Sequence, residues 1–361
     1  MTRAAALALS ALLCAAAPMA LSPGLAMAQP KLAAGFKTPR TAFGQPDLYG
    51  YWSNATLTTE ARPAALGTRK AYTPEEVAKL ESAVAKEAEE GDAPTDPNET
   101  TESLAAKAKT ANVRPEFAAA GGDVGGYNRG WLDPGGQVMR VGGEPRTSFI
   151  TTANGQAPPR KAGAPAPPSF RGMGGFDSYE SRSIGERCIM GFGRNAGPPM
   201  FPNGFYNNNY QFIQTPDSFL IEVEMVHDLR IVRLNSKHRT DGVRPWMGDS
   251  IGWWDGDTMV VETTNIPQRQ AYRGSWQNLK VTERFTRVAK DRLHYAFTVE
   301  DPTIWDAAWG GEYEFAPMNG VIYEYACHEG NYSLPGILAG ARVEEADAAK
   351  AKAGGATGSA N

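Results

Sequence analysis

The sequence predicts a mainly β protein whose strands follow one another as an antiparallel up-and-down meander. From residue 206 onward, runs rich in aromatic and β-branched residues alternate with short turn sequences. The turns TPDS, DGD, VAKDR and PMNG contain the residue types that favour tight reversals. Helical and loop insertions are expected only in the N-terminal part. The meander is expected to close into a barrel or to form a strongly curved sheet.

The strands are predicted from local composition, in chain order. A first strand is expected in PDLYGYWSNATLT (46–58), and a strand with a turn in RTSFITTANG (146–155). The strands expected in the meander are NYQFIQT (209–215), SFLIEVEMVHDLRIVRLN (218–235), IGWWDGDTMVVETTNI (251–266), LKVTERFTRV (279–288), DRLHYAFTVED (291–301), GGEYEFAP (310–317) and GVIYEYACHE (320–329).

One helix is predicted at 74–90. Thr73 supplies the N-cap, Pro74 suits the first helical position, and Glu76 completes a capping box, while Gly91 ends the run. Before it, residues 29–46 are expected to form an extended leader. The Pro/Gly-rich stretch 154–176 is expected to be a mobile loop, and the Ala/Gly-rich tail 341–361 to be disordered. Residues 47–340 are predicted to form a single β-rich domain.

The first 28 residues have the pattern of a signal peptide. A short basic start precedes an apolar Ala/Leu-rich run, which ends at Ala26-Met27-Ala28, a small-x-small cleavage pattern. This predicts a periplasmic or secreted protein, with no membrane insertion after cleavage. The formal net charge of −4 argues against a nucleic-acid partner, since such proteins usually carry a basic patch. The oligomeric state is not predicted.

Cleavage would leave two cysteines, Cys188 and Cys327. In an oxidising compartment an even pair is most simply a disulfide, and a free thiol nucleophile or thiolate ligand is the alternative. His328 follows the second cysteine and precedes a Gly-Asn turn, so it is expected to orient this loop. The sequence has no histidine or cysteine spacing typical of a metal site, and no phosphate-binding loop. No metal and no cofactor are therefore predicted.

Strict alternation along 218–232 places His227 on the apolar face of one long strand, and alternation along 279–288 places Glu283 on another. An imidazole and a carboxylate that face an apolar interior are the kind of pair that enzymes use for proton transfer. The alternative is a structural hydrogen bond or ion pair in a partly polar core, with Arg284 or Arg187 as the partner of Glu283.

These residues support a hypothesis of cofactor-independent acid–base catalysis, of hydratase, lyase or isomerase type. His227, tuned by Asp228 or Glu283, would move a proton, and Arg230 or Arg187 would stabilise developing negative charge. Neither a serine-hydrolase motif nor a calcium loop is present, because Asp255-Gly256-Asp257 has the character of a hairpin turn.

The segment 183–212 combines Gly, Pro, Met and aromatic residues with three consecutive asparagines. Such a segment at a barrel mouth suits recognition of a small hydrophobic or aromatic molecule, although it could equally be a plug that closes one end of the barrel. The residues expected to contact a ligand are Arg187, Tyr206, Asn208, Tyr210, Trp254, Tyr325 and His328.

Two motifs resemble known families. Gly50-Tyr51-Trp52 resembles the G-x-W signature of lipocalins and other calycins. In that family the Trp packs across the barrel base, often against an Arg of a late strand. The motifs WDGDTMVVETTN (254–265) and YEYACHEGNY (323–332) are similar to those of an uncharacterised family of secreted bacterial proteins. The first resemblance implies a lipocalin/calycin-like barrel, and the second implies no activity.

These observations favour an exported β-barrel-like protein that binds a small hydrophobic or aromatic molecule within the β-scaffold. The acid–base enzyme described above is the alternative. A second alternative is a non-catalytic envelope protein whose aromatic-rich surface contacts another protein.

Overall fold

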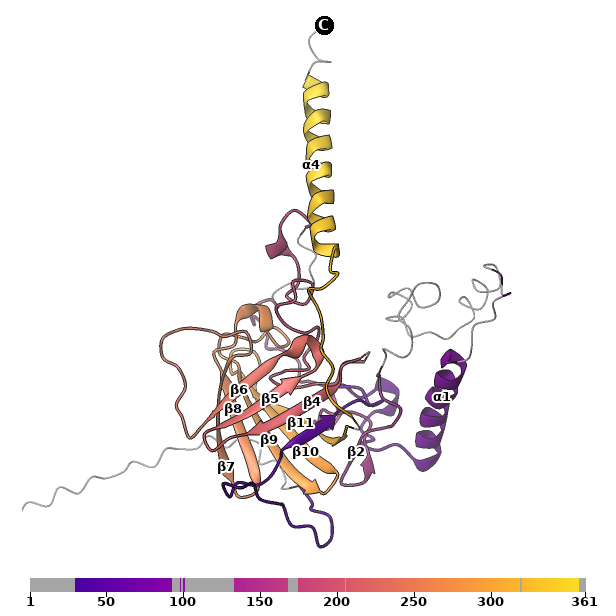
Figure 1. The fold of residues 1–361 in the computed structure, drawn as a ribbon, viewed down its shortest axis with the longest axis vertical. Helices are drawn as coiled ribbons and strands as arrows, with labels where there is room; N and C mark the ends of the chain where they lie inside the picture. Colours follow the sequence, from indigo (N-terminus) through magenta and orange to yellow (C-terminus); the bar gives the residue numbers. More distant parts are fainter. Residues whose placement is uncertain are drawn as a thin grey trace, which may run out of the picture.

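The computed structural model describes residues 30–92, 98, 100, 133–167, 175–204, 206–318 and 320–356. The predicted signal peptide, residues 1–28, lies outside the described residues. Nine strands close into a barrel in the order β1-β11-β10-β9-β8-β7-β6-β5-β4, so the prediction of a mainly β fold that forms a barrel is confirmed. Figure 1 shows α1 beside the barrel and α4 projecting away from it.

The barrel strands are β1 (Gly50–Ser53), β4 (Asn209–Gln214), β5 (Ser218–Val223), β6 (Leu229–Leu234), β7 (Asp249–Asp255), β8 (Thr258–Thr264), β9 (Lys280–Ala289), β10 (Arg292–Glu300) and β11 (Trp309–Pro317). A separate short hairpin is made by β2 (Arg140–Val141) and β3 (Glu144–Pro145). The helices are α1 (Pro74–Asp92) and α4 (Ser333–Ala356), with short 3₁₀ turns η1 (Ala64–Leu66), η3 (Tyr179–Ser181), η4 (Met225–His227) and η5 (Gln268–Gln270).

Strand pairing departs from a simple meander at one place. Every neighbouring pair in the barrel is antiparallel except β6 and β7, which are parallel and are joined by the connection 235–248. The hairpin turn predicted at Asp255-Gly256-Asp257 joins β7 to β8, with Gly256 at φ +61°. Closure depends on β1, which pairs with β4 on one side and with β11 on the other.

Aromatic side chains fill the barrel interior. Tyr295 lies 4.8 Å from Tyr313 and 5.1 Å from Phe285, measured between ring centroids. The rings of Phe212 and Phe315 are 5.5 Å apart in an edge-on contact. All of these side chains are fully buried. Aromatic pairs at these separations and angles add stability beyond the area that they bury.

Trp52 of β1 packs against an arginine of a late strand. The guanidinium of Arg287, on the late strand β9, lies 5.6 Å from the centroid of the Trp52 ring. The indole N–H donates to the carbonyl of Leu48 at 3.2 Å. A cation over an indole face is favourable because the ring quadrupole attracts positive charge.

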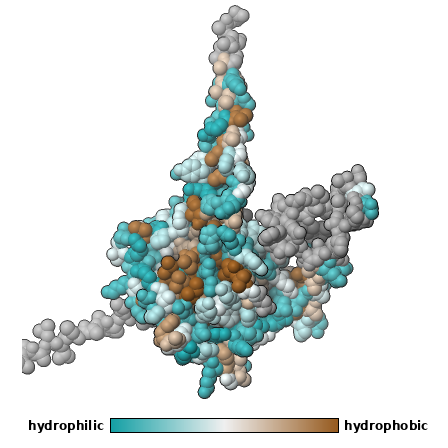
Figure 2. Space-filling view, in the orientation of Figure 1, coloured by the Kyte–Doolittle hydropathy of each residue, from teal (hydrophilic) through white to brown (hydrophobic). Residues whose placement is uncertain are grey.

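The run 218–235 is two strands and not the single strand expected from its alternation. The 3₁₀ turn η4 separates β5 from β6, with Val226 at φ +57° and His227 at φ +44°. The turn exchanges the two faces: odd-numbered residues are buried in β5, and even-numbered residues are buried in β6. Leu229 and Ile231 are therefore 44% and 54% exposed, while Arg230 points into the barrel. Figure 2 shows apolar surface gathered where β5 and β6 lie.

Three further expectations about local structure need correction. Residues 320–329, all described, form no strand. Residues 146–155 contribute only two isolated bridges, Arg146 with Ala71 and Ile150 with Gly311. The tail predicted to be disordered belongs to α4 as far as residue 356. By contrast, α1 contains the predicted helix, and its capping box has formed: the Thr73 N–H donates to Glu76 at 2.8 Å and the Glu76 N–H donates to Thr73 Oγ1 at 3.3 Å.

The segment 190–204 plugs one end of the barrel, which is one of the two interpretations given for residues 183–212. The Met200 N–H donates to the Tyr295 hydroxyl at 2.9 Å, and the Tyr313 hydroxyl donates to the Met200 carbonyl at 3.1 Å. Phe201 packs edge-on against Phe297 with ring centroids 5.2 Å apart. These contacts anchor the plug to the aromatic interior. The predicted loop 154–176 contains no helix or strand in its described residues, 154–167 and 175–176.

Candidate functional site

A groove lies at the plugged end of the barrel, outside the packed interior. It has a volume of about 840 Å³ and is formed by four parts of the chain far apart in the sequence: Asp133, the loop 185–192, the β4–β5 region, and the segment that leads into α4. The lining residues are Asp133, Gly185, Glu186, Phe192, Tyr206, Asn207, Asn209, Glu224, Tyr323, Glu324, Tyr325, Ala326, Cys327, Asn331, Ser333, Leu334 and Ile337.

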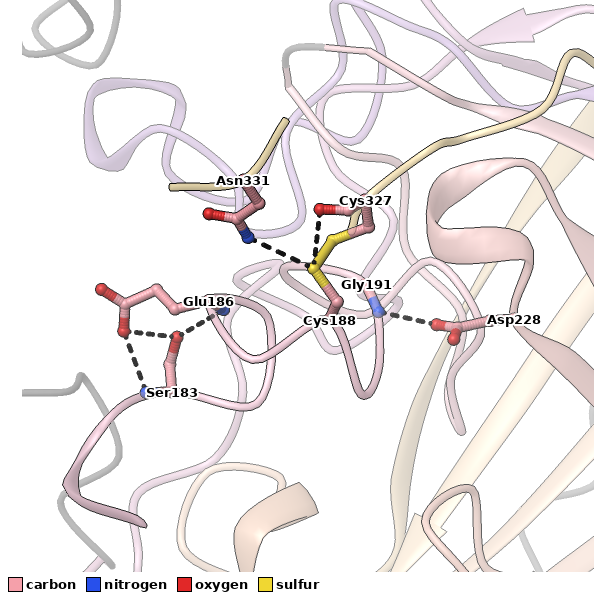
Figure 3. The surroundings of a disulfide bond; sticks show 7 residues. All are labelled: Ser183, Glu186, Cys188, Gly191, Asp228, Cys327 and Asn331. Carbon is pink, nitrogen blue, oxygen red and sulfur yellow. Dashed lines mark hydrogen bonds between the residues drawn. A yellow bond between two sulfur atoms is a disulfide. The ribbon is translucent and has the colours of Figure 1, made fainter. Parts of the chain in front are cut away.

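A disulfide between Cys188 and Cys327 ties two walls of the groove together, as predicted. Their Cα atoms are 5.8 Å apart, and the bond closes a loop with a sequence separation of 139. The Asn331 side-chain amide lies 3.6 Å from the Cys188 sulfur (Figure 3). The bond holds the C-terminal segment against the plug although that segment has no strand partner.

A second anchor joins the loop of Cys188 to the barrel (Figure 3). The Gly191 N–H donates to the carboxylate of Asp228 at 2.9 Å. A side chain at residue 191 would clash, because a Cβ there would stand 2.8 Å from the side chain of Met225. Burial raises the pKa of Asp228 to about 6, although the Gly191 hydrogen bond and the nearby His227 act in the opposite direction.

Aromatic and aliphatic side chains form much of the groove surface. Phe192 and Tyr323 are 40% and 73% exposed, and Leu334 and Ile337 come from the first turns of α4. Gly185 allows Phe192 to lie flat on the loop, since a Cβ at Gly185 would come within 2.6 Å of its ring. Exposed aromatic rings concentrated in one hollow distinguish this groove from ordinary surface.

The charged residues of the groove are all acidic. Asp133, Glu186, Glu224 and Glu324 line it, and none of the described lining residues is Lys, Arg or His. Glu224 accepts from the Asn209 amide at 2.5 Å. Burial raises the pKa of Glu224, and the neighbouring Asp133 adds to this effect; burial also raises the pKa of Asp133. Burial disfavours the charge on Glu186, but hydrogen bonds from Arg182 and Ser183 lower its pKa.

Only some of the residues predicted to contact a ligand lie in the groove. Tyr206 and Tyr325 line the groove, and His328 is exposed beside the disulfide. Arg187 does not line it; its guanidinium lies 5.2 Å from the Tyr179 ring. Asn208 is buried and holds the plug, donating to Asp133 and Asn203 carbonyls at 2.7 and 2.8 Å. The remaining two, Tyr210 and Trp254, lie in β4 and β7 and not in the groove.

Glu283 is inside the barrel, as predicted, but its partner is Arg230. Two hydrogen bonds of 2.7 and 3.0 Å join the guanidinium to the carboxylate, and both side chains are buried from solvent. The Tyr295 hydroxyl donates to Glu283 at 2.7 Å, and burial together with the Glu283 charge raises the pKa of Tyr295. The expected partners were wrong: Arg284 pairs with Asp255, and Arg187 lies at the surface loop.

His227 does not face the interior, because the turn η4 turns it outward. It lines an adjoining groove of about 400 Å³ on the outer side of the barrel, together with Tyr51 and Glu222, and this groove shares Tyr323 and Glu324 with the first one. Glu283 and His227 are thus on opposite sides of the barrel wall. The geometry therefore does not bring His227 and Glu283 together. The other residue expected to tune His227 is Asp228, whose buried carboxylate accepts from the Gly191 N–H.

The described residues contain neither a metal-binding cluster nor a membrane-spanning helix. No group of three or more His, Cys, Asp and Glu side chains there is placed to hold a metal ion. Neither helix in that part of the chain combines the length and apolar character needed to cross a membrane.

Comparison with other proteins adds little. The chain matches no protein-family model and no curated protein. One solved structure to which it is similar is that of a mutant of the fluorescent protein UnaG, at 12% identity and a TM-score of 0.20. The alignment covers 31% of this chain and 72% of that one.

Sequence reasoning missed the acidic and apolar wall of the groove: Asp133, Phe192, Glu224, Tyr323, Leu334 and Ile337. One signal was available. The motif YEYACHEGNY alternates tyrosines with carboxylates next to a cysteine, and its tyrosines were assigned to a strand. Since that segment has no strand partner, its aromatic rings are left to line a surface hollow.

Proposed function

We propose that this protein binds a small molecule with an aromatic or apolar body and a positively charged group in the groove beside the disulfide. The observation that carries the proposal is the composition of the lining: aromatic rings and four carboxylates surround about 840 Å³, with no basic side chain among the described lining residues. We therefore propose a ligand site at the barrel mouth and not in the β-scaffold interior.

The apolar part of the ligand follows from the exposed rings. Small-molecule sites are concave and mostly apolar, with a few polar groups that fix orientation. Tyrosine suits such a wall because its ring contacts an apolar body while its hydroxyl remains available to polar neighbours. Tyr206, Tyr323 and Tyr325 come from two different stretches of chain, so a ligand between them would contact both.

The positively charged group of the ligand is inferred from the carboxylates of the groove. Burial raises the pKa of both Asp133 and Glu224, and none of the described residues that line the groove is a cation that would offset their ionised charge. A ligand ammonium group would favour the ionised carboxylates and could also lie over a tyrosine face. Binding should then release protons wherever these carboxyl groups are partly protonated in the free protein.

The barrel interior supports this function less well. Closely packed rings and the Arg230–Glu283 pair occupy it, and the plug covers one end. A ligand in the interior would have to displace these contacts, whereas the groove is already open.

The compartment forms part of the proposal. The disulfide is a bond that an oxidising compartment preserves. Together with the signal-peptide pattern of residues 1–28, it supports an exported protein that meets its ligand outside the cytoplasm.

The proposal is tested with three probes of similar size and different charge: phenyltrimethylammonium, benzyl alcohol and benzoate, titrated by calorimetry. The cation should bind most tightly and benzoate least. Tyr325→Ala and Glu224→Gln should each weaken binding of the cation by about tenfold, the loss of one contact of roughly 1.4 kcal/mol. Tyr49→Ala, at an exposed tyrosine outside the groove, is the matched control.

Two results would contradict the proposal in different ways. If none of the probes binds, or if Tyr325→Ala changes nothing, the groove is not the site. If all probes bind equally and Glu224→Gln has no effect, the groove binds apolar molecules without selecting a charge.

A further inference from the structure

A second pocket lies between the N-terminal insertions and β11, away from the groove. It has a volume of about 170 Å³ and is lined by Arg62, Lys70, Arg146, Ser148, Ile150, Thr151 and Glu312. Three of these residues are cations and one is an acid. None of them lines the groove of the proposed function, so the two pockets are independent.

Arg62 is a buried cation without a carboxylate partner. Only 3% of the residue is exposed, and no carboxylate of the described residues forms an ion pair with it. Its guanidinium donates to Thr147 Oγ1 at 2.8 Å and to the Ala153 carbonyl at 2.9 Å. Burial and the nearby charge of Arg146 lower the pKa of Arg62. Buried charges are ordinarily paired, so this one lacks the counter-ion expected of it.

The single acid in the pocket is already neutralised. Glu312 forms an ion pair with Arg146 and also lies 3.2 Å from the ring Nε2 of His294. These contacts keep the pKa of Glu312 low in spite of its burial. Arg146 makes one more contact, with Glu144 at 3.2 Å. Glu312 is therefore not free to balance the charge of Arg62.

The pocket is shaped by close packing. Gly155, at φ +65°, sits where a Cβ would be 2.7 Å from both Arg62 Cβ and Ser148 Oγ. The main chain of Gly155 also accepts from the Arg62 N–H at 2.9 Å. The guanidinium is thus held in one orientation by backbone carbonyls, a hydroxyl and a glycine. Lys70 lies at the exposed rim, and its ammonium pairs with no carboxylate in the part of the chain that the structure describes.

We infer that this pocket binds a small oxyanion of the size of phosphate or sulfate. Guanidinium groups present several N–H donors in a planar fork that matches such oxygens, and Lys70 adds a charge at the rim. The hydroxyls of Ser148 and Thr151 already donate to the Ile150 and Gly310 carbonyls at 3.0 and 3.1 Å, so the cations supply the donors for the anion. An anion here would supply the counter-ion that Arg62 lacks.

The test is calorimetric titration of the full mature chain with sodium phosphate and with sodium sulfate, against sodium chloride at matched ionic strength. We expect saturable binding of one oxyanion per chain. Lys70→Gln should weaken it by about tenfold, since a charge-assisted hydrogen bond is lost without disturbing the fold. Lys237→Gln removes an equally exposed cation that lines neither pocket and should leave the affinity unchanged.

Arg62→Gln should abolish oxyanion binding while leaving binding of phenyltrimethylammonium in the groove intact, which also reports that the variant is folded. The inference is overturned if phosphate and sulfate give no saturable heat, or if Lys70→Gln and Lys237→Gln weaken binding equally. Equal weakening by the two variants would mean that oxyanion binding depends only on the overall charge of the protein and that the pocket is not a specific site.

Discussion

The barrel interior and the groove at its mouth are built from the same kinds of side chain, tyrosines and carboxylates, but they differ in how those groups are satisfied. Inside, Glu283 is held by both Arg230 and the Tyr295 hydroxyl, and aromatic rings fill the remaining space. In the groove, Glu224 accepts hydrogen bonds from the Asn209 and Asn207 side chains and the Tyr323 main chain, but no cation stands among the described lining residues. A satisfied carboxylate stabilises a core, whereas an incompletely compensated one beside exposed rings suits a ligand.

The largest expected effect comes from removing the covalent link that shapes the groove. Cys188→Ser with Cys327→Ser should lower the free energy of unfolding by about 4–5 kcal/mol, because the loop of sequence separation 139 is no longer closed in the unfolded chain. Denaturant titration measures this loss. Affinity for the cationic probe should fall at the same time, because the C-terminal wall is released.

This variant separates the two regions. Near-ultraviolet circular dichroism should still report a packed barrel, since the interior contacts do not involve the disulfide. Unchanged probe affinity would mean that the C-terminal wall is held by other contacts and that the disulfide has no part in shaping the groove.

The converse change breaks the interior. Glu283→Gln should destabilise the fold by about 3–5 kcal/mol, because it leaves the guanidinium of Arg230 buried without its anion. The exposed pair Arg284–Asp255 provides the matched control, and Arg284→Gln should cost about 0–1 kcal/mol. Both are measured by denaturant titration. If both variants lower the free energy of unfolding equally, burial does not make the Arg230–Glu283 pair more important for stability than an exposed pair.

The smallest effect concerns the anchor between the two regions. Burial raises the pKa of Asp228 to about 6, so the folded protein holds this proton more tightly than the unfolded chain does. Its ionisation therefore costs stability as pH rises from about 4 to about 6. Asp228→Asn keeps an oxygen that can accept from the Gly191 N–H and removes that cost.

The variant should accordingly be more stable than the wild type above pH 6, by at most about 3 kcal/mol, and this advantage should vanish below about pH 4. The measurement is the free energy of unfolding of the wild type and of Asp228→Asn across this pH range. A difference that does not change with pH would show that Asp228 is not the titrating group.

Much of the barrel could be predicted from the sequence because alternation and turn residues are local signals. Leu279, Val281, Glu283 and Phe285 all face inward, as their spacing indicated. The same reasoning failed at 224–228, where Val226 adopts a left-handed conformation that β-branched residues rarely take. No glycine or asparagine marked the turn, so every later side chain of the run was assigned to the wrong face.

The candidate site was harder to predict because it is assembled from segments without regular structure. Tyr206 and Tyr325 were identified from composition, but their neighbours across the groove depend on the disulfide and the plug. The ion pair of Arg230 and Glu283 depends on strand order and register, which one sequence does not reveal. Pairings across distant segments therefore mark the limit of what the residues alone could predict.

The short strand β1 has a consequence for how the chain acquires this fold. Its residues pair with β4 on one side and with β11 on the other, and the partner of Trp52 in β11 is Pro317. Sequence separations of this length carry a large entropic cost of loop closure and slow the search for native contacts. Because a ribosome produces the chain from its N-terminus, β1 appears first and can be enclosed only after residue 317 has been made. Closing the barrel is therefore a late, whole-chain event, and a fragment that stops before β11 would have an open sheet with two unpaired edges.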